Sequence, residues 1–149
     1  MKLNLQNRPL QFSNTKILAL FTLLVILADE LSKIIAQKSL DVSCNRGIAF
    51  GFGTEGKIMS LAALILVLWF LVKAKEDVRK IGLTLIFAGG LANLVDRVVS
   101  GCVRDFIAIW IFPTFNLSDI AITFGVVVTL YALVINERKG LAKSDEHNF

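Results

Sequence analysis

The sequence predicts an all-α membrane protein with four transmembrane helices and a small extracytoplasmic part with short β-strands. Of its 149 residues, 55% are hydrophobic, and the mean hydropathy of +0.68 is too high for an ordinary soluble domain. Four stretches approach the roughly 20 apolar residues that cross a bilayer, at about 17–36, 58–72, 81–99 and 120–135. The chain is too short for several domains, so we expect one membrane-embedded domain over residues 1–149.

The first two predicted spans depart from a uniform apolar run. Asp29, Glu30 and Lys33 shorten the first run to the length of a signal-peptide core, but no A-x-A cleavage site follows, so we expect a retained span. Asp29 and Lys33 lie on one helical face and can form an ion pair, whereas Glu30 should point elsewhere and extend to the interface. The second span, 58–72, is short and needs the lysines at its ends to complete it.

The third predicted span carries polar residues on one face near its end. Asn93, Asp96 and Arg97 are spaced i, i+3 and i+4, which places them side by side on a helix. Gly89 and Gly90 precede them and allow this helix to come close to a neighbouring helix or to a substrate.

The distribution of basic residues predicts the topology. Ten of the 16 Lys and Arg residues precede the first span, connect the second to the third, or follow the fourth. By the positive-inside rule, both termini and the middle loop are cytoplasmic, and loops 37–57 and 100–118 face outward. The net charge of +4 is therefore a topology signal. The basic residues form no aromatic-interleaved face, so we expect no nucleic-acid partner.

The two outer loops have unusual compositions. The segment 45–53 alternates glycines with small and apolar residues, which suits either a turn-rich hairpin or a close approach of backbone to an extended ligand. In the second loop, the apolar segment 103–112 should lie on the membrane surface or pack over the helix ends. A short strand around 102–107 would put Asp105 and Arg104 on opposite faces. Pro113 should then break the run.

Two carboxylates on this outer side form the candidate site. Asp105 lies in the second outer loop, and Asp119 lies in the first turn of the fourth helix, where Ser118 or Asn116 can cap it. Ionisable groups near hydrocarbon are costly, so such a pair predicts a functional site. Two carboxylates that share a site titrate as a coupled pair, which suits acid–base hydrolysis of a peptide bond. The helix dipole favours an ionised Asp119 by roughly 0.3–1 kcal/mol, so we assign Asp119 as base and Asp105 as acid.

Other chemistries have less support in the sequence. The only histidine, His147, lies in the cytoplasmic tail, which excludes a familiar serine or cysteine triad. A serine with Lys33 as base remains an alternative, with Ser32, Ser100 or Ser118 as the nucleophile. The outer acids lack histidine support, so we expect neither a metal nor a cofactor. Cys44 and Cys102 are expected as free thiols, with a disulfide as the alternative because an outer compartment permits one.

Five segments together carry a resemblance to a known family. They are DELSK at 29–33, NRGIAFG at 45–51, GGLANLVDR at 89–97, GCVRDF at 101–106 and FNLSD at 115–119. The chain resembles the lipoprotein signal peptidases, or signal peptidases II, which are bacterial four-helix membrane aspartic proteases. The resemblance covers nearly the whole span region, and the specificity comes from five motifs in the right order.

The resemblance implies roles for individual residues. Asp105 and Asp119 would form the catalytic dyad, and the residues that shape the site and hold the substrate would be Asp29, Lys33, Asn45, Gly47, Asn93, Asp96, Arg97 and Asn116. Two positions depart from the family pattern: Ala92 stands where glycine is usual, and Ser118 where alanine is usual. Both changes are small in volume, so we expect the site to survive.

The resemblance also implies the substrate and the location. Such enzymes cut the signal peptide of a prolipoprotein before a diacylglyceryl-modified cysteine, so the partners are the lipidated precursor and membrane lipid. We expect a monomer in the bacterial inner membrane with its site toward the outer face. The apolar loop 106–112 is a candidate clamp for the substrate. The alternatives are a four-span transport subunit or scaffold and an inactive relative of the peptidase.

Overall fold

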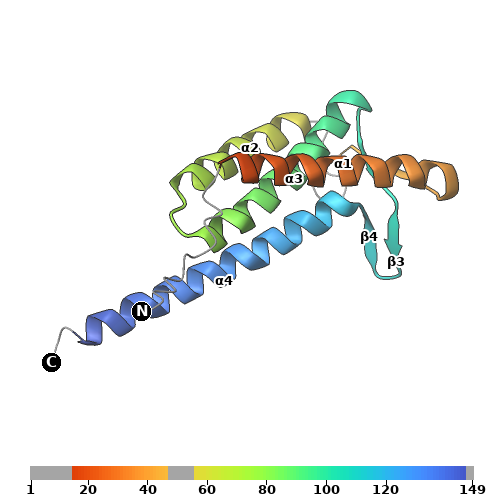
Figure 1. Cartoon of the computed structure of the whole chain (residues 1–149). Helices are drawn as coiled ribbons and strands as arrows, with labels where there is room; N and C mark the ends of the chain where they lie inside the picture. The colour runs from red at the N-terminus through yellow and green to blue at the C-terminus, as the bar shows by residue number, and fades with distance from the viewer. Residues whose placement is uncertain (1–14, 47–55, 147–149) are drawn as a thin grey trace, which may run out of the picture.

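The computed structural model describes residues 15–46 and 56–146, with the side chains after Arg138 excepted. Four helices account for most of these residues: α1 Thr15–Ser39, α2 Gly56–Lys73, α3 Asp77–Val99 and α4 Leu117–Glu146. Consecutive helices run in opposite directions, and α3 contacts each of the other three (Figure 1). All four segments predicted as spans are therefore helical.

Three of the helices are long and apolar enough to cross a bilayer: α2, α3 and residues Leu117–Arg138 of α4. Helix α1, at 25 residues, has the length for a span, and it carries the charged residues Asp29, Glu30 and Lys33. The predicted span at about 120–135 lies within α4. Helix α4 continues to Glu146 and extends past the other helices (Figure 1), because the following residues are mostly good helix formers and include no proline.

Two small antiparallel sheets lie at the end of the molecule where α4 begins. Strand β1 Ser43–Asn45 pairs with β2 Val103–Asp105, with Ser43 opposite Asp105 and Asn45 opposite Val103. The predicted strand at 102–107 is confirmed in part, since β2 ends at Asp105. Its alternation is also confirmed, because Val103 and Asp105 are buried whereas Arg104 is partly exposed.

The second sheet is a hairpin of β3 Ile107–Ile109 and β4 Phe112–Phe115. The prediction that Pro113 breaks this run is wrong, because Pro113 lies within β4. A two-stranded sheet leaves one edge of each strand without a partner, where a residue lacking an N–H is tolerated. The hairpin projects from the bundle (Figure 1), and Trp110 at its tip is fully exposed.

The expectation of two free thiols is wrong, because Cys44 and Cys102 form a disulfide with their Cα atoms 5.5 Å apart. The bond joins β1 to the residue just before β2, 58 positions away in sequence. A pair of three-residue strands is marginal by itself, so this covalent link secures the α1–α2 connection to the α3–α4 connection.

Close packing between α3 and α4 depends on glycine. A Cβ atom on Gly89 would collide with the carbonyl oxygen of Ser118 and would lie 2.8 Å from Cγ1 of Ile122. Gly90 faces α2 instead, where a Cβ would lie 3.1 Å from the end of the flexible Leu64 side chain. Gly89 thus allows α3 to approach a neighbouring helix, at the turn where α4 begins.

Replacing Gly89 by alanine should lower the stability of the protein, because the new methyl group meets backbone that cannot move without shifting α4. Overpacking of this kind typically costs about 1–3 kcal/mol, more than the roughly 1 kcal/mol that alanine gains over glycine in a helix. The matched control is Gly90→Ala, which should keep or raise the melting temperature in detergent. Equal melting temperatures for the two variants would contradict this account.

Candidate active site

Asp119 is held in the first turn of α4 by reciprocal hydrogen bonds with Asn116. The backbone N–H of Asp119 donates to Asn116 Oδ1 at 3.0 Å, and the backbone N–H of Asn116 donates to Asp119 Oδ2 at 3.1 Å. Side chains here satisfy N–H groups that a helix start leaves without acceptors. Of the two predicted caps, Asn116 is confirmed and Ser118 is wrong. The local sequence therefore orients the Asp119 carboxylate.

Asp105 is positioned by β2, and only 1% of its surface is exposed. Pairing of β1 with β2 brings Asn45 close, and its Nδ2 donates to Asp105 Oδ2 at 3.1 Å. Asn116 Nδ2 donates to Asp105 Oδ1 at 2.7 Å. Each carboxylate oxygen of Asp105 thus accepts an amide N–H.

Amide groups connect the two carboxylates. The Nδ2 group of the fully buried Asn116 also donates to Asn93 Oδ1 at 3.1 Å, and Asn93 Nδ2 donates to Asp119 Oδ1 at 2.9 Å. Asn116 therefore contacts both acids directly, and Asn93 reaches Asp119 from α3. These contacts orient the acids without adding charge.

The environment raises the pKa of Asp105 to about 6, from the usual 3.8. Burial is the main cause, because it disfavours the charged carboxylate. The hydrogen bonds from Asn45 and Asn116 and the charge of Lys33 lower the pKa, whereas the charge of Asp119 raises it. Asp105 thus retains its proton to a higher pH than an ordinary aspartate does.

Charged residues of α1 and α3 form a second set of contacts. Lys33 is fully buried, and its Nζ lies 2.5 Å from Asp29 Oδ2 and 2.8 Å from Asp96 Oδ2. The predicted ion pair between Asp29 and Lys33 is confirmed, and Asp96 extends it. Because Lys33 lies between two carboxylates and Ser32 Oγ donates to the Asp29 carbonyl oxygen at 2.7 Å, the serine–lysine alternative gains no support.

Arg104 links these charges to β2. Its backbone N–H donates to Asp96 Oδ2 at 3.0 Å, and its Nε donates to Asp96 Oδ1 at 2.9 Å. Its Nη2 contacts Asp96 and donates to Glu30 Oε2 at 2.6 Å. Glu30 points away from Asp29 and Lys33, and it has in Arg104 an ionic partner that the sequence prediction did not include.

The same charges reach the start of α4 through Asp29. The backbone N–H of Ser118 donates to Asp29 Oδ1 at 2.9 Å. The Ser118 hydroxyl is buried and has no hydrogen-bond partner within the described part of the chain. The backbone of residue 118, not its side chain, therefore makes the contact.

Arg97 completes the polar face of α3. It is 6% exposed, its Nη1 donates to the Asn93 carbonyl oxygen at 3.4 Å, and its charge interacts with both aspartates of the pair. Gly56 leaves room for it, since a Cβ there would lie 3.1 Å from Arg97 Nε. The predicted alignment of Asn93, Asp96 and Arg97 on one face is confirmed.

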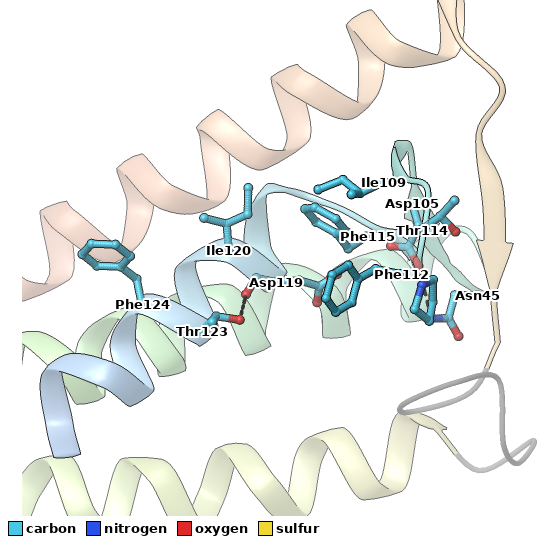
Figure 2. Close-up of a pocket in the computed structure, with 11 residues that line it drawn as sticks. Asn45, Asp105, Ile109, Phe112, Thr114, Phe115, Asp119, Ile120, Thr123 and Phe124 are labelled. Carbon is cyan, nitrogen blue, oxygen red and sulfur yellow. Dashed lines mark hydrogen bonds between the residues drawn. The ribbon is translucent and has the colours of Figure 1, made fainter.

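Two cavities open beside the carboxylates. The first, of about 550 Å³, contains Asp105 and Asp119 among mostly apolar residues of the β3–β4 hairpin and α4, including Ile109, Phe112 and Phe124 (Figure 2). The second, of about 360 Å³, is lined by α2, α3 and α4. Asp119 lines both cavities, and its half-buried side chain is accessible from each.

The structure brings together nine of the ten predicted site residues, namely Asp29, Lys33, Asn45, Asn93, Asp96, Arg97, Asp105, Asn116 and Asp119. Gly47 and His147 lie outside the described residues. Sequence reasoning missed Glu30 and Arg104 as partners and the backbone of Ser118 as a donor. The alternation of the predicted strand puts the side chains of Arg104 and Asp105 on opposite faces, but nothing in the sequence identifies the ionic partners of Arg104.

The fold and these side chains define a helical membrane protein with a carboxylate pair at one end of its bundle, the arrangement expected of a membrane-embedded aspartic peptidase. Residues 21–135 match the family described as Signal peptidase (SPase) II. The chain belongs to the signal peptidase II family.

Individual relatives agree with this assignment. The lipoprotein signal peptidase of Polynucleobacter necessarius is 34% identical over 82% of this chain and 90% of its own length. That of Burkholderia cenocepacia is 38% identical over 74% of this chain and 82% of its own. Two solved structures titled as bacterial membrane enzymes have TM-scores of 0.73 and 0.70 at 26% identity. They match 83% and 80% of this chain and 91% and 94% of theirs.

Proposed function

We propose that this chain is an aspartic endopeptidase that removes the signal peptide from diacylglyceryl-modified prolipoproteins, cutting before the lipidated cysteine. Family membership supports the reaction and the substrate class. The observation that carries the catalytic assignment is the amide-bridged pair of Asp105 and Asp119 in one cavity. No acyl-enzyme forms, because neither carboxylate acts as the nucleophile.

The reaction assigns a different task to each carboxylate. Asp119 takes a proton from water, whose oxygen attacks the scissile carbonyl carbon, while Asp105 donates its proton to the carbonyl oxygen. In the second step, the C–N bond breaks and the amine nitrogen leaves with the proton held by Asp119. The tetrahedral intermediate returns its hydroxyl proton to Asp105, which restores the starting state. The raised pKa of Asp105 supports its role as the acid.

The two cavities suit the two parts of the substrate. We assign the signal helix to the cavity between α2, α3 and α4, and the lipidated segment to the cavity beside the hairpin. Asp119 borders both, so a chain passing from one to the other would cross the carboxylate pair. Apolar side chains line most of each cavity, as lipid and signal-helix surfaces require.

We propose four spans, with both termini and the α2–α3 connection cytoplasmic and the site at the outer face of the bacterial inner membrane. Helix α1 is about 37 Å long at 1.5 Å per residue, and its exposed leucines suit contact with lipid. The charges of Asp29 and Lys33 compensate each other inside the bundle. The contacts among the four helices support a single domain, and a site complete within one chain supports a monomer.

Family membership disfavours a transport subunit or scaffold. An inactive relative is also disfavoured, because both departures from the family pattern fit the structure. Ala92 is fully buried in α3, and Ser118 contributes its backbone N–H to the site.

Replacing either acid by its amide, as Asp105→Asn or Asp119→Asn, should abolish cleavage of a purified lipidated precursor. Loss of proton transfer should reduce kcat by roughly 10²–10⁴-fold while the variants remain folded, as judged by melting temperature in detergent. Asp77→Asn, at the other end of α3, is the matched control and should retain activity. Activity retained by both dyad variants would refute the mechanism.

The pH profile of kcat/KM should decline on its alkaline side with an apparent pKa near 6. Asp105 must be protonated to act as the acid, so activity is lost as pH rises through its raised pKa. The Asn45 hydrogen bond lowers this pKa, so Asn45→Ala should move the alkaline limb to higher pH. A limb that stays in place or moves to lower pH in Asn45→Ala would show that another group controls it.

Substitution of the exposed hairpin residues, as Trp110→Ala with Phe112→Ala, should weaken processing of the lipidated precursor. Phe112 lines the first cavity, and Trp110 presents exposed apolar surface at the tip of the same hairpin, so their loss should raise KM several-fold and leave kcat nearly unchanged. Trp69→Ala, which removes an exposed tryptophan from α2, serves as control. Unchanged KM and kcat in this double variant would contradict the interpretation of loop 106–112 as a clamp for the substrate.

A further inference from the structure

A continuous series of polar contacts joins the residue next to one aspartate to the residue next to the other. It begins at Arg104, passes through Asp96, Lys33 and Asp29, and ends at the backbone N–H of Ser118. Arg104 precedes Asp105 in β2, and Ser118 precedes Asp119 in α4. The series therefore holds both segments that carry the proposed dyad.

Arg104 occupies the face of β2 opposite to Asp105. Successive side chains of a strand point to opposite faces, and the burial pattern of β2 follows that rule. Arg104 is not among the residues that line either cavity at the dyad. Its contacts are instead with Asp96 of α3 and Glu30 of α1. Arg104 thus holds Asp105 through the strand that they share.

The contacts of Arg104 define the position of the strand closely. Its backbone N–H and Nε bind the two different oxygens of Asp96, at 3.0 and 2.9 Å. The guanidinium contacts Oδ1 through both Nε and Nη2, while the backbone N–H holds Oδ2, so these contacts restrict rotation as well as distance. The contact with Glu30, at 2.6 Å, adds a second helix as an anchor. A strand of three residues has few hydrogen bonds of its own with which to resist displacement.

We propose that Arg104, paired with Glu30 and Asp96, is a positioning residue that sets the placement of Asp105 relative to Asp119. This proposal rests on the dyad mechanism proposed above and adds two residues, Arg104 and Glu30, to the machinery that supports it. Because neither residue touches substrate, their loss should change turnover and leave substrate binding intact.

The test compares four purified single variants, and the double variant of Arg104→Gln with Glu30→Gln, with the wild-type chain on a lipidated precursor, with kcat and KM measured separately. Arg104→Gln removes the guanidinium and its charge, Arg104→Lys keeps the charge, and Glu30→Gln keeps the guanidinium contacts with Asp96 but weakens the anchor to α1. The matched control is Arg79→Gln, which breaks a 2.7 Å ion pair with Glu76 at the opposite end of α3. Melting temperatures in detergent identify the temperature range in which each variant is folded.

Arg104→Gln should lower kcat by roughly 10- to 100-fold with KM unchanged within about twofold, the effect expected of a small misplacement of a catalytic group. Arg104→Lys should recover part of that loss, Glu30→Gln should lose a few-fold in kcat, and Arg79→Gln should match the wild type. Adding Glu30→Gln to the Arg104→Gln variant should lower kcat by a smaller factor than Glu30→Gln does in the wild-type chain, because the two residues act through one contact.

Normal kcat in Arg104→Gln would overturn the proposal, and so would an increase in KM with kcat unchanged, since that would indicate a substrate contact. If Arg104→Gln fails to fold, Glu30→Gln decides the matter, and normal kcat in that variant overturns the proposal. The dyad mechanism is judged separately by Asp105→Asn, whose inactivity would stand whatever the Arg104 variants do.

Discussion

The structure depends on a lysine charge that is completely removed from solvent. Lys33 lies between Asp29 and Asp96, and all three side chains are fully buried. Removing such charges from water costs several kcal/mol per ion, so the cluster is tolerable only if its partners are held in good geometry. That requirement fixes α1 against α3. The remaining oxygens of the two acids then reach outward, to Ser118 of α4 and Arg104 of β2.

Charged groups and neutral groups have different tasks in this site, and the difference affects the pKa of Asp105. Charged side chains anchor the segments that carry Asp105 and Asp119, whereas the hydrogen bonds made to their carboxylates come from the neutral groups of Asn45, Asn93 and Asn116. Neutral donors orient a carboxylate without supplying a full positive charge to keep it ionised. Burial can then dominate, and it raises the pKa of Asp105. An acid pair needs that outcome if one member is to retain a proton.

Sequence reasoning succeeded where local periodicity decides the structure and failed where distant segments meet. Helical spacing was enough to place Asn93, Asp96 and Arg97 on one face, and the sequence indicated the two carboxylates that the structure places in one cavity. The partner of Glu30 lies 74 residues away on a strand, so spacing could not identify it. The disulfide likewise depends on the pairing of β1 with β2 across 58 positions. Pro113 is a local exception, because the edge of a two-stranded hairpin tolerates a residue without an N–H. The anchoring contacts are long-range, whereas the Asn116 cap of Asp119 is local.

The distinction between backbone and side-chain contacts also explains how the site accommodates Ser118. The structure uses the N–H of this residue, which any residue except proline supplies, and leaves its hydroxyl buried without a partner in the described chain. An unsatisfied buried hydroxyl costs about 1–3 kcal/mol, so serine here weakens the fold without altering the contact from Asp29 to α4. Alanine, the residue usual in the family that the chain resembles, would make the same contact without that cost. The departure therefore bears on stability and leaves the geometry of the acid pair intact.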